Sequence, residues 1–175
     1  MTSPDLPVVH ITHELAQETA RILSSFATER PSEGIVYWFG IERGDAAVVT
    51  TLIVPDADTN DGCIRTSVEA NAAAITVITG TPLVFIGQAH SHPGRHVSHS
   101  QVDDEEGFAR FDGAISVVVP WFGKYGLSIE QCGVHRHMNG KYSRVRDIEA
   151  HLRILPGFAD LRAKNKREGG DVETS

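Results

Sequence analysis

Residues 83–103 read LVFIGQAHSHPGRHVSHSQVD, and this stretch decides the fold. It opens with a continuous apolar run, 83–89, that turns polar at His90. Such a run is typical of a central strand whose C-terminal tip delivers side chains to a cleft. Pro93 and Gly94 then turn the chain. A helix is expected to begin near Ser98 or Ser100 and to continue to about residue 108 or 111.

The polar half of this stretch carries a candidate metal site. On an extended strand, residues i and i+2 point to the same side, so His90 and His92 can present two imidazoles to one cation. Ser100 and Asp103 sit one turn apart at the expected helix start. Two imidazoles and one carboxylate, with a fourth position for water, form the ligand set of a catalytic zinc site. A closed structural site more often recruits cysteines, and none are near in the sequence.

Each of these patterns also has a purely structural interpretation. Two histidines separated by one residue can be ordinary polar residues at a strand end. The spacing S-x-x-D is also that of a helix capping box, and Ser98 with Gln101 forms a competing box. The capping and metal-binding roles are compatible, because a cap would fix the helix that presents Asp103.

Hydrolysis at a metal also needs a base that takes a proton from water. Glu33 stands immediately before the strand expected at 35–39, where a carboxylate can point into a cleft. The acidic run 104–106 follows Asp103 and offers three further carboxylates. The residues by themselves leave the base open among these four, and a solvent-exposed Glu33 at a strand entry is the structural alternative.

The remaining pattern predicts a mixed sheet flanked by helices in one domain, a fold of the α/β (α+β mixed) class. Residues 1–11 are expected to be an N-terminal extension, 12–160 the domain, and 161–175 a disordered tail. The expected helices are 11–23 with Thr12 as N-cap, 67–78 and 148–155. The expected strands are 35–39 and 46–54 as a hairpin, 114–119, and 127–135 with 141–145 around an Asn139-Gly140 turn. Residues 55–62 are expected to be a loop.

Composition narrows the class of protein. The chain has 175 residues and a formal net charge of −7, which argues against a nucleic-acid binder. Its start lacks a signal pattern and no apolar stretch is long enough to span a bilayer, so a cytoplasmic protein without membrane contact is expected. Cys63 and Cys132 form no CxxC pair and are expected to be reduced thiols, although a bridge between them stays open.

The string HSHPGRHVSHSQVD resembles the signature of the JAMM (MPN-plus) metalloproteases: two histidines spaced by one residue, seven residues, then serine, two residues and aspartate. Upstream, PSEGIVYWFG resembles the family's strand that opens with glutamate and closes with glycine, here Glu33 and Gly40. Val36 stands where the family often has a glycine. The resemblance covers residues 12–145 and is to the short, stand-alone prokaryotic members.

The resemblance implies a single-domain MPN/JAB fold of the cytidine-deaminase-like type, with one Zn²⁺ per chain. It makes His90, His92 and Asp103 the zinc ligands, Glu33 the general base and Ser100 the donor that stabilises the oxyanion. It implies hydrolysis of the amide bond after the C-terminus of a ubiquitin-like protein, in deconjugation or precursor processing. Activating and conjugating enzymes of such a pathway, including anti-phage defence, would be its partners.

Two alternatives to this function stay open. One is processing of a ubiquitin-fold sulfur-carrier protein, and the other is a non-catalytic MPN scaffold, against which the five retained positions argue. His96 and His99 are expected to be solvated loop residues, and Cys63 has no assigned role.

Overall fold

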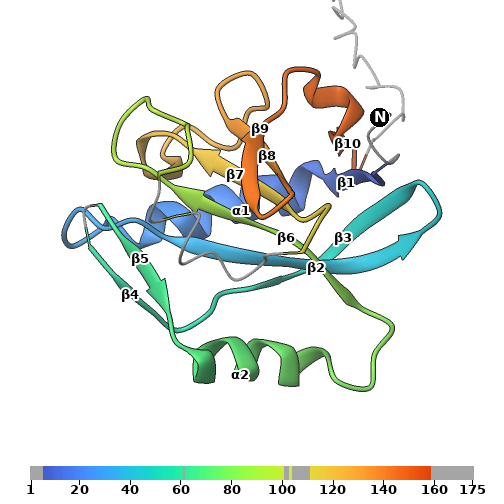
Figure 1. The fold of residues 1–175 in the computed structure, drawn as a ribbon. Helices are drawn as coiled ribbons and strands as arrows, with labels where there is room; N and C mark the ends of the chain where they lie inside the picture. The colour runs from blue at the N-terminus through green and yellow to red at the C-terminus, as the bar shows by residue number, and fades with distance from the viewer. Residues whose placement is uncertain (1–5, 61, 101–102, 104–110, 159–175) are drawn as a thin grey trace, which may run out of the picture.

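The computed structural model describes residues 6–60, 62–100, 103 and 111–158. Its centre is an eight-stranded mixed sheet in the order β10-β1-β3-β2-β6-β7-β8-β9 (Figure 1). The strands are β1 (Val8–Thr12), β2 (Ile35–Arg43), β3 (Ala46–Ile53), β6 (Val84–Ser91), β7 (Ile115–Val119), β8 (Gly133–Met138), β9 (Lys141–Arg144) and β10 (Leu152–Leu155). The other elements are helices α1 (His13–Ser25) and α2 (Val68–Ile78), the short sheet β4 (Ala57–Thr59) with β5 (Ile64–Thr66), and the 3-10 turns η1 (Trp121–Gly123) and η2 (Ile148–Ala150).

Strand β2 carries the core of both faces of the sheet. Successive strand residues point to opposite faces. Val36 and Trp38 therefore pack with the cluster that includes Leu23 of α1, and Tyr37 and Phe39 pack on the opposite face with α2. Because both faces are covered, the apolar run of β2 is continuous rather than alternating.

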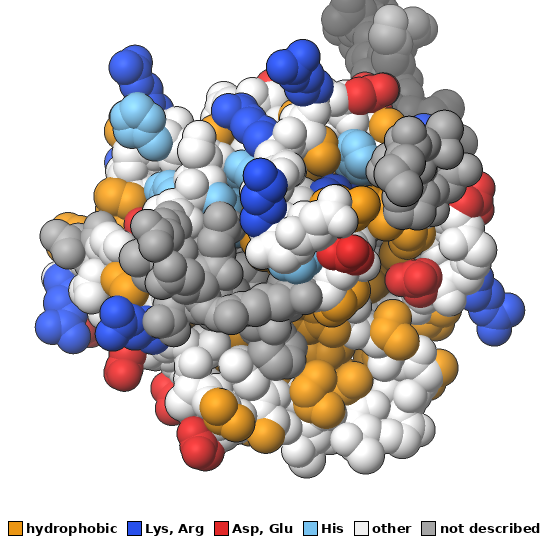
Figure 2. All heavy atoms as spheres, viewed as in Figure 1, with side chains coloured by type: hydrophobic (Ala, Val, Ile, Leu, Met, Phe, Trp, Pro, Cys, Tyr) orange, Lys and Arg blue, Asp and Glu red, His pale blue; other side chains and the backbone are white. Residues whose placement is uncertain are grey.

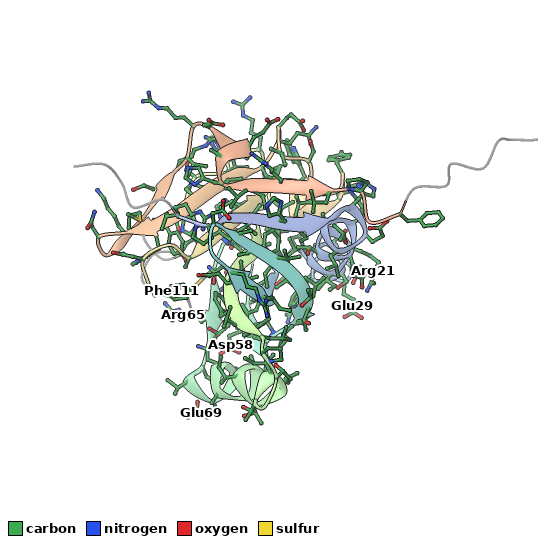
Figure 3. The ribbon with its side chains drawn as sticks, turned by 90° about the vertical axis from the view of Figure 1, so that its right-hand side faces the viewer. Arg21, Glu29, Asp58, Arg65, Glu69 and Phe111 are labelled. Atoms are coloured by element: carbon green, nitrogen blue, oxygen red, sulfur yellow. The ribbon has the colours of Figure 1, made fainter. Side chains whose placement is uncertain are left out.

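Hydrogen bonds attach each helix to this strand. The Trp38 indole N–H donates to Thr19 Oγ1 of α1 at 3.2 Å, and the Tyr37 hydroxyl donates to Asn71 Oδ1 of α2 at 2.7 Å. Figure 3, which labels Asp58, Arg65 and Glu69, shows that β4, β5 and α2 lie together on one side of the main sheet.

The main expectations for the fold are confirmed. Strands β2 and β3 form the antiparallel hairpin, and β6 lies between β2 and a parallel β7. Thr12 caps α1 by accepting from the Leu15 N–H at 3.3 Å, and Ser67 caps α2 by accepting from the Ala70 N–H at 3.0 Å. Asn139 and Gly140 adopt the positive φ angles that the hairpin turn between β8 and β9 requires.

Three segments differ from expectation. Residues 127–132 are not strand, because the N–H groups of Gln131 and Cys132 both donate to the Ser128 carbonyl and close a turn. Residues 148–155, expected as a helix, form η2 and then β10, which pairs with β1 in parallel. β4 lies inside the expected loop 55–62.

Only the N-terminal boundary expected for the domain can be compared with the described residues. Residues 8–12 form β1, an interior strand between β10 and β3, so the boundary expected at residue 12 falls inside the sheet. The tail expected at 161–175, and most of the helix expected after Ser100, lie outside the described residues. In the part of the chain that is described, no helix is long and apolar enough to cross a membrane.

Candidate metal centre

Two histidines lie at the C-terminal end of strand β6, His90 within the strand and His92 directly after it. His90 is buried at 2% exposure, and the His92 ring lies beside it with a centroid distance of 5.1 Å. His90, His92 and Asp103 each offer one ligand atom, and these three atoms lie within 4.8 Å of one another. The structure therefore brings together the three residues that the sequence predicts as ligands.

Two of the three distances between the candidate ligand atoms are close to those of a metal site. Asp103 Oδ2 lies 3.6 Å from His90 Nε2 and 3.5 Å from His92 Nε2, both longer than a hydrogen bond. Ligand atoms in a tetrahedral zinc site with bonds of about 2.1 Å lie about 3.4 Å apart. Among the residues that the structure describes, His90 Nε2 is one of seven buried side-chain atoms with no hydrogen-bond partner, and it lies 3.6 Å from Asp103 Oδ2.

The two histidine rings are oriented so that their Nε2 atoms face the same space. His92 Nδ1 lies 3.0 Å from the His96 carbonyl, which leaves Nε2 for a cation. A hydrogen bond from the second ring nitrogen to a carbonyl is the usual way in which proteins fix the tautomer of a metal-binding histidine. Figure 2 shows that histidine side chains occur in the upper half of this face of the molecule.

Asp103 is held by a reciprocal cap with Ser100. The Ser100 N–H donates to Asp103 Oδ2 at 2.7 Å, and the Asp103 N–H donates to Ser100 Oγ at 3.1 Å. This is capping-box geometry, so the structural interpretation of S-x-x-D is correct, and Asp103 also belongs to the group of three residues that could hold a metal ion. The competing cap from Ser98 to Gln101 falls on a residue outside the described ranges.

The charges of the site alter the pKa values of its members. Burial alone would raise the pKa of Asp103, but the His90 and His92 rings hold it well below its usual range. Burial alone would lower the pKa of His92, yet Asp103 and then Glu33 raise it above its ordinary value. Negative charge thus faces the imidazoles, an environment that suits a bound cation.

Glu33 reaches the site because β2 and β6 pair beyond the end of β2. The Ser91 N–H donates to the Gly34 carbonyl at 3.0 Å, and the Gly34 N–H donates to Ser91 Oγ at 2.9 Å. Continuing the register of Ile35 with His90 by two residues places Glu33 opposite His92, whose pKa Glu33 helps to raise. Glu33 is buried at 5% exposure, so its carboxylate is not the solvent-exposed one of the alternative interpretation. The rival carboxylates at 104–106 lie outside the described residues.

His99 is the functional candidate that the sequence prediction missed. It was expected to be solvated, but its ring stacks on Tyr142 at 4.6 Å and lies 2.8 Å, through Nε2, from Ser116 Oγ. Burial, reinforced by the His90 and His135 rings, lowers its pKa to about 2. The sequence does contain a signal for its burial, because Val97 and His99 alternate with Ser98 and Ser100. His96, by contrast, is exposed and contributes its carbonyl.

The two cysteines lie outside the site. Both thiols are free, so the bridge that the sequence left open does not form. Cys132 is buried, and Cys63 is half-exposed beside β5.

Comparison with known proteins agrees with this arrangement. No protein-family model matches the chain. A probable metalloprotease, y4jG of Sinorhizobium fredii (strain NBRC 101917 / NGR234), is 29% identical over 108 residues, which cover 59% of this chain and 66% of that protein. The match thus spans somewhat under two thirds of the relative's length.

Solved structures show the fold. Protein DSY2949 from Desulfitobacterium hafniense has a TM-score of 0.66 at 13% identity, covering 85% of this chain and 94% of its own. AF2198 from Archaeoglobus fulgidus, a JAB1/MPN domain protein, has a TM-score of 0.50 at 17% identity, covering 82% and 97%. Together with the metalloprotease relative, this fold confirms the resemblance to the JAMM/MPN family that residues 33–40 and 90–103 predict.

Proposed function

We propose that the chain is a zinc-dependent peptidase that hydrolyses the amide bond after the C-terminus of a ubiquitin-like protein. One observation carries the metal-dependent part of this proposal. His90 Nε2 is buried without a hydrogen-bond partner in the described structure, and it faces the Nε2 of His92 and the Oδ2 of Asp103. The name of the Sinorhizobium relative and the JAB1/MPN fold support the same activity.

The donor set favours zinc over magnesium or calcium, since the latter two prefer all-oxygen ligands. His90, His92 and Asp103 would hold the ion and leave a fourth position open. Zinc bound there would supply Lewis acidity, which makes water a better nucleophile and polarises the scissile carbonyl.

The chain's own residues supply the proton transfers. Glu33, buried opposite His92, accepts a proton from the attacking water and delivers it to the leaving amine. Its burial keeps bulk water from competing for that proton. The carboxylate also faces the imidazole whose pKa it raises, which holds negative charge where the water must be deprotonated.

Ser100 is suited to stabilise the oxyanion of the tetrahedral intermediate. Its Oγ accepts a hydrogen bond from the Asp103 N–H, which leaves the hydroxyl proton available for donation. Ser100 is exposed, so a substrate carbonyl can reach it. The reciprocal cap fixes its position relative to the ligand Asp103, and this pre-organisation is what an oxyanion donor needs.

The resemblance to the family supports the substrate class. A ubiquitin-like protein ends in an extended tail, and an extended segment is a form of substrate that proteins bind through main-chain hydrogen bonds. The bond that is cut would be an isopeptide bond to a target lysine or a peptide bond in a precursor.

The test uses a fusion of a ubiquitin-like protein to a C-terminal reporter peptide. The zinc-loaded protein is expected to release the peptide, a chelator is expected to stop the release, and added zinc is expected to restore it. A sulfur-carrier protein with the same reporter serves as the second substrate. Cleavage that a chelator does not affect, or zinc-loaded protein that cuts neither fusion, would overturn the proposal.

A further inference from the structure

The loop between the metal-binding strand and Asp103 is attached to the sheet by two inward side chains. Val97 is buried and His99 is half-buried, whereas Ser98 and Ser100 are exposed. This alternation means that one side of the segment is held against the protein and the other side faces solvent.

The His99 ring occupies a slot built from three strands. It stacks on Tyr142 of β9, with ring centroids 4.6 Å apart and planes at 26°, and its centroid is also 4.6 Å from that of His135 of β8. Its Nε2 lies 2.8 Å from the hydroxyl of Ser116, a fully buried residue of β7. On its remaining side it meets the edge of the ligand His90, at a centroid distance of 5.2 Å and an angle of 87°.

The backbone of the same segment rests directly on β8. A Cβ atom at Gly133 would lie 1.9 Å from the Val97 carbonyl oxygen and 2.9 Å from His135 Cε1. Only glycine therefore permits this contact, and the loop has no room to shift toward the sheet. This backbone contact does not involve the His99 ring, and it also holds the segment against the sheet.

We propose that His99 is a positioning residue for the metal site. It fixes the loop that carries Ser100 and Asp103, and it fixes the ring plane of His90, without contacting the metal itself. Ser100 is the next residue in the chain, so a movement of His99 is transmitted to the cap that holds Asp103 Oδ2. This role rests on the proposed metal site.

The geometry separates this role from that of a fourth ligand. His99 Nε2 is directed to Ser116, and His99 is not among the residues whose ligand atoms converge. Residues that orient metal ligands typically change metal affinity by about 10- to 100-fold when they are replaced, whereas loss of a ligand has a larger effect.

The experiment measures zinc affinity by competition with a chromophoric chelator, and it measures the visible spectrum of the Co²⁺-substituted protein. His99→Ala is expected to weaken zinc binding by about 10- to 100-fold and to alter the cobalt spectrum. Ser116→Ala, which removes only the hydrogen bond, is expected to act in the same direction with a smaller loss. Arg95→Ala, in the same loop but exposed, is the matched control and is expected to leave both readings unchanged.

Each outcome decides the matter. Zinc affinity and a cobalt spectrum that are unchanged in His99→Ala would overturn the positioning role and leave the proposed function intact. Loss of zinc as complete as in His90→Ala would make His99 a ligand and overturn it as well. If the unmutated protein binds no zinc, the proposed function fails, and the role of His99 fails with it. Should His99→Ala not fold, as judged by circular dichroism, the milder Ser116→Ala decides by the same criteria.

Discussion

Ser100 and Asp103 hydrogen-bond to each other in both directions, through the Ser100 N–H to Asp103 Oδ2 at 2.7 Å and the Asp103 N–H to Ser100 Oγ at 3.1 Å. The oxygen that the Ser100 N–H fixes is the same oxygen that faces His90 and His92. The hydrogen-bonded pair of Ser100 and Asp103 thus includes the oxygen that is proposed to bind the metal. Consequently, the observed role of the Ser100 side chain as an acceptor and its proposed role as oxyanion donor must be separated by experiment.

Replacing Ser100 by alanine is expected to reduce turnover by about a hundredfold, the usual effect of losing one oxyanion donor. Zinc content should be retained, because the backbone N–H that fixes Asp103 Oδ2 remains. Loss of the cap acceptor should lower the free energy of unfolding by about 1 kcal/mol. Turnover of the reporter fusion and urea unfolding measure the two effects.

Ser98→Ala is the matched control for this change, since Ser98 is exposed in the same loop. Its turnover should equal that of the unmutated protein. If Ser100→Ala also keeps full turnover, Ser100 is only a cap.

Replacing Glu33 by glutamine is expected to preserve the fold and zinc binding but to reduce turnover by about 10² to 10⁴, since the isosteric amide cannot accept the proton. Zinc content, circular dichroism and turnover are the three measurements. Glu29→Gln, an exposed change four residues earlier, is the control and should be fully active. Retained turnover in Glu33→Gln would move the base to another carboxylate.

The sequence predicts those parts of the candidate site whose residues lie close together along the chain. His90 with His92, and Ser100 with Asp103, are pairs whose spacing fixes their relation on a strand or a helical turn. Glu33 is 57 residues before His90, and its place depends on the pairing of β2 with β6, which spacing does not contain. Its assignment needed the family resemblance, and the slot that holds His99 is equally non-local.

The fold was predictable where a segment carries its own signal. The continuous apolar runs of β6 and β7 and the capped helix α1 are such segments. Strand β10 has the four-residue sequence LRIL, which is too short to distinguish the periodicity of a strand from that of a helix. It is extended because it pairs with β1. Strand β1 runs directly into α1 at Thr12, so the helical pattern concealed it.

Gly40 is expected to tolerate no side chain. A Cβ atom there would lie 1.8 Å from the Val48 carbonyl oxygen and 2.7 Å from Ile86 Cδ1, at the point where the pairing of β2 with β3 shifts register. Gly40→Ala should therefore lower the free energy of unfolding by about 1–3 kcal/mol or more, measured by urea denaturation. In contrast, Gly94→Ala meets nothing within 4 Å and should change it little. Equal stability of the two variants would contradict this account.

Arg136 is expected to be a stability determinant. It is 3% exposed, and its guanidinium donates to the carbonyls of Gly113, Pro7 and His151, which joins the sheet to the segment before β1. Arg136→Met would leave these carbonyls without their donor and should cost about 3 kcal/mol or more in unfolding free energy. Arg153→Met, at an exposed site, is the control and should cost under about 1 kcal/mol. A small effect of Arg136→Met would show that water replaces the guanidinium.

The two cysteines are expected to differ sharply in reactivity. Cys132 is 2% exposed, and burial raises the pKa of its thiol to about 12, so at pH 8 it is neither ionised nor accessible. A thiol reagent should therefore modify only Cys63 in the native protein and both residues in urea. Cys63→Ser should abolish the native reaction.

The raised pKa of Cys132 also has a consequence for stability. In the unfolded chain this thiol ionises above about pH 8.5, whereas in the native state it stays neutral up to about pH 12. Between about pH 8.5 and pH 12 the unfolded state therefore binds fewer protons than the native state. The contribution of Cys132 to the free energy of unfolding falls as the pH rises above about 8.5. Unfolding free energies of the Cys63→Ser protein and of the Cys63→Ser, Cys132→Ala protein, measured from pH 7 to 10, should show a steeper decline when Cys132 is present. Parallel profiles would contradict the assignment.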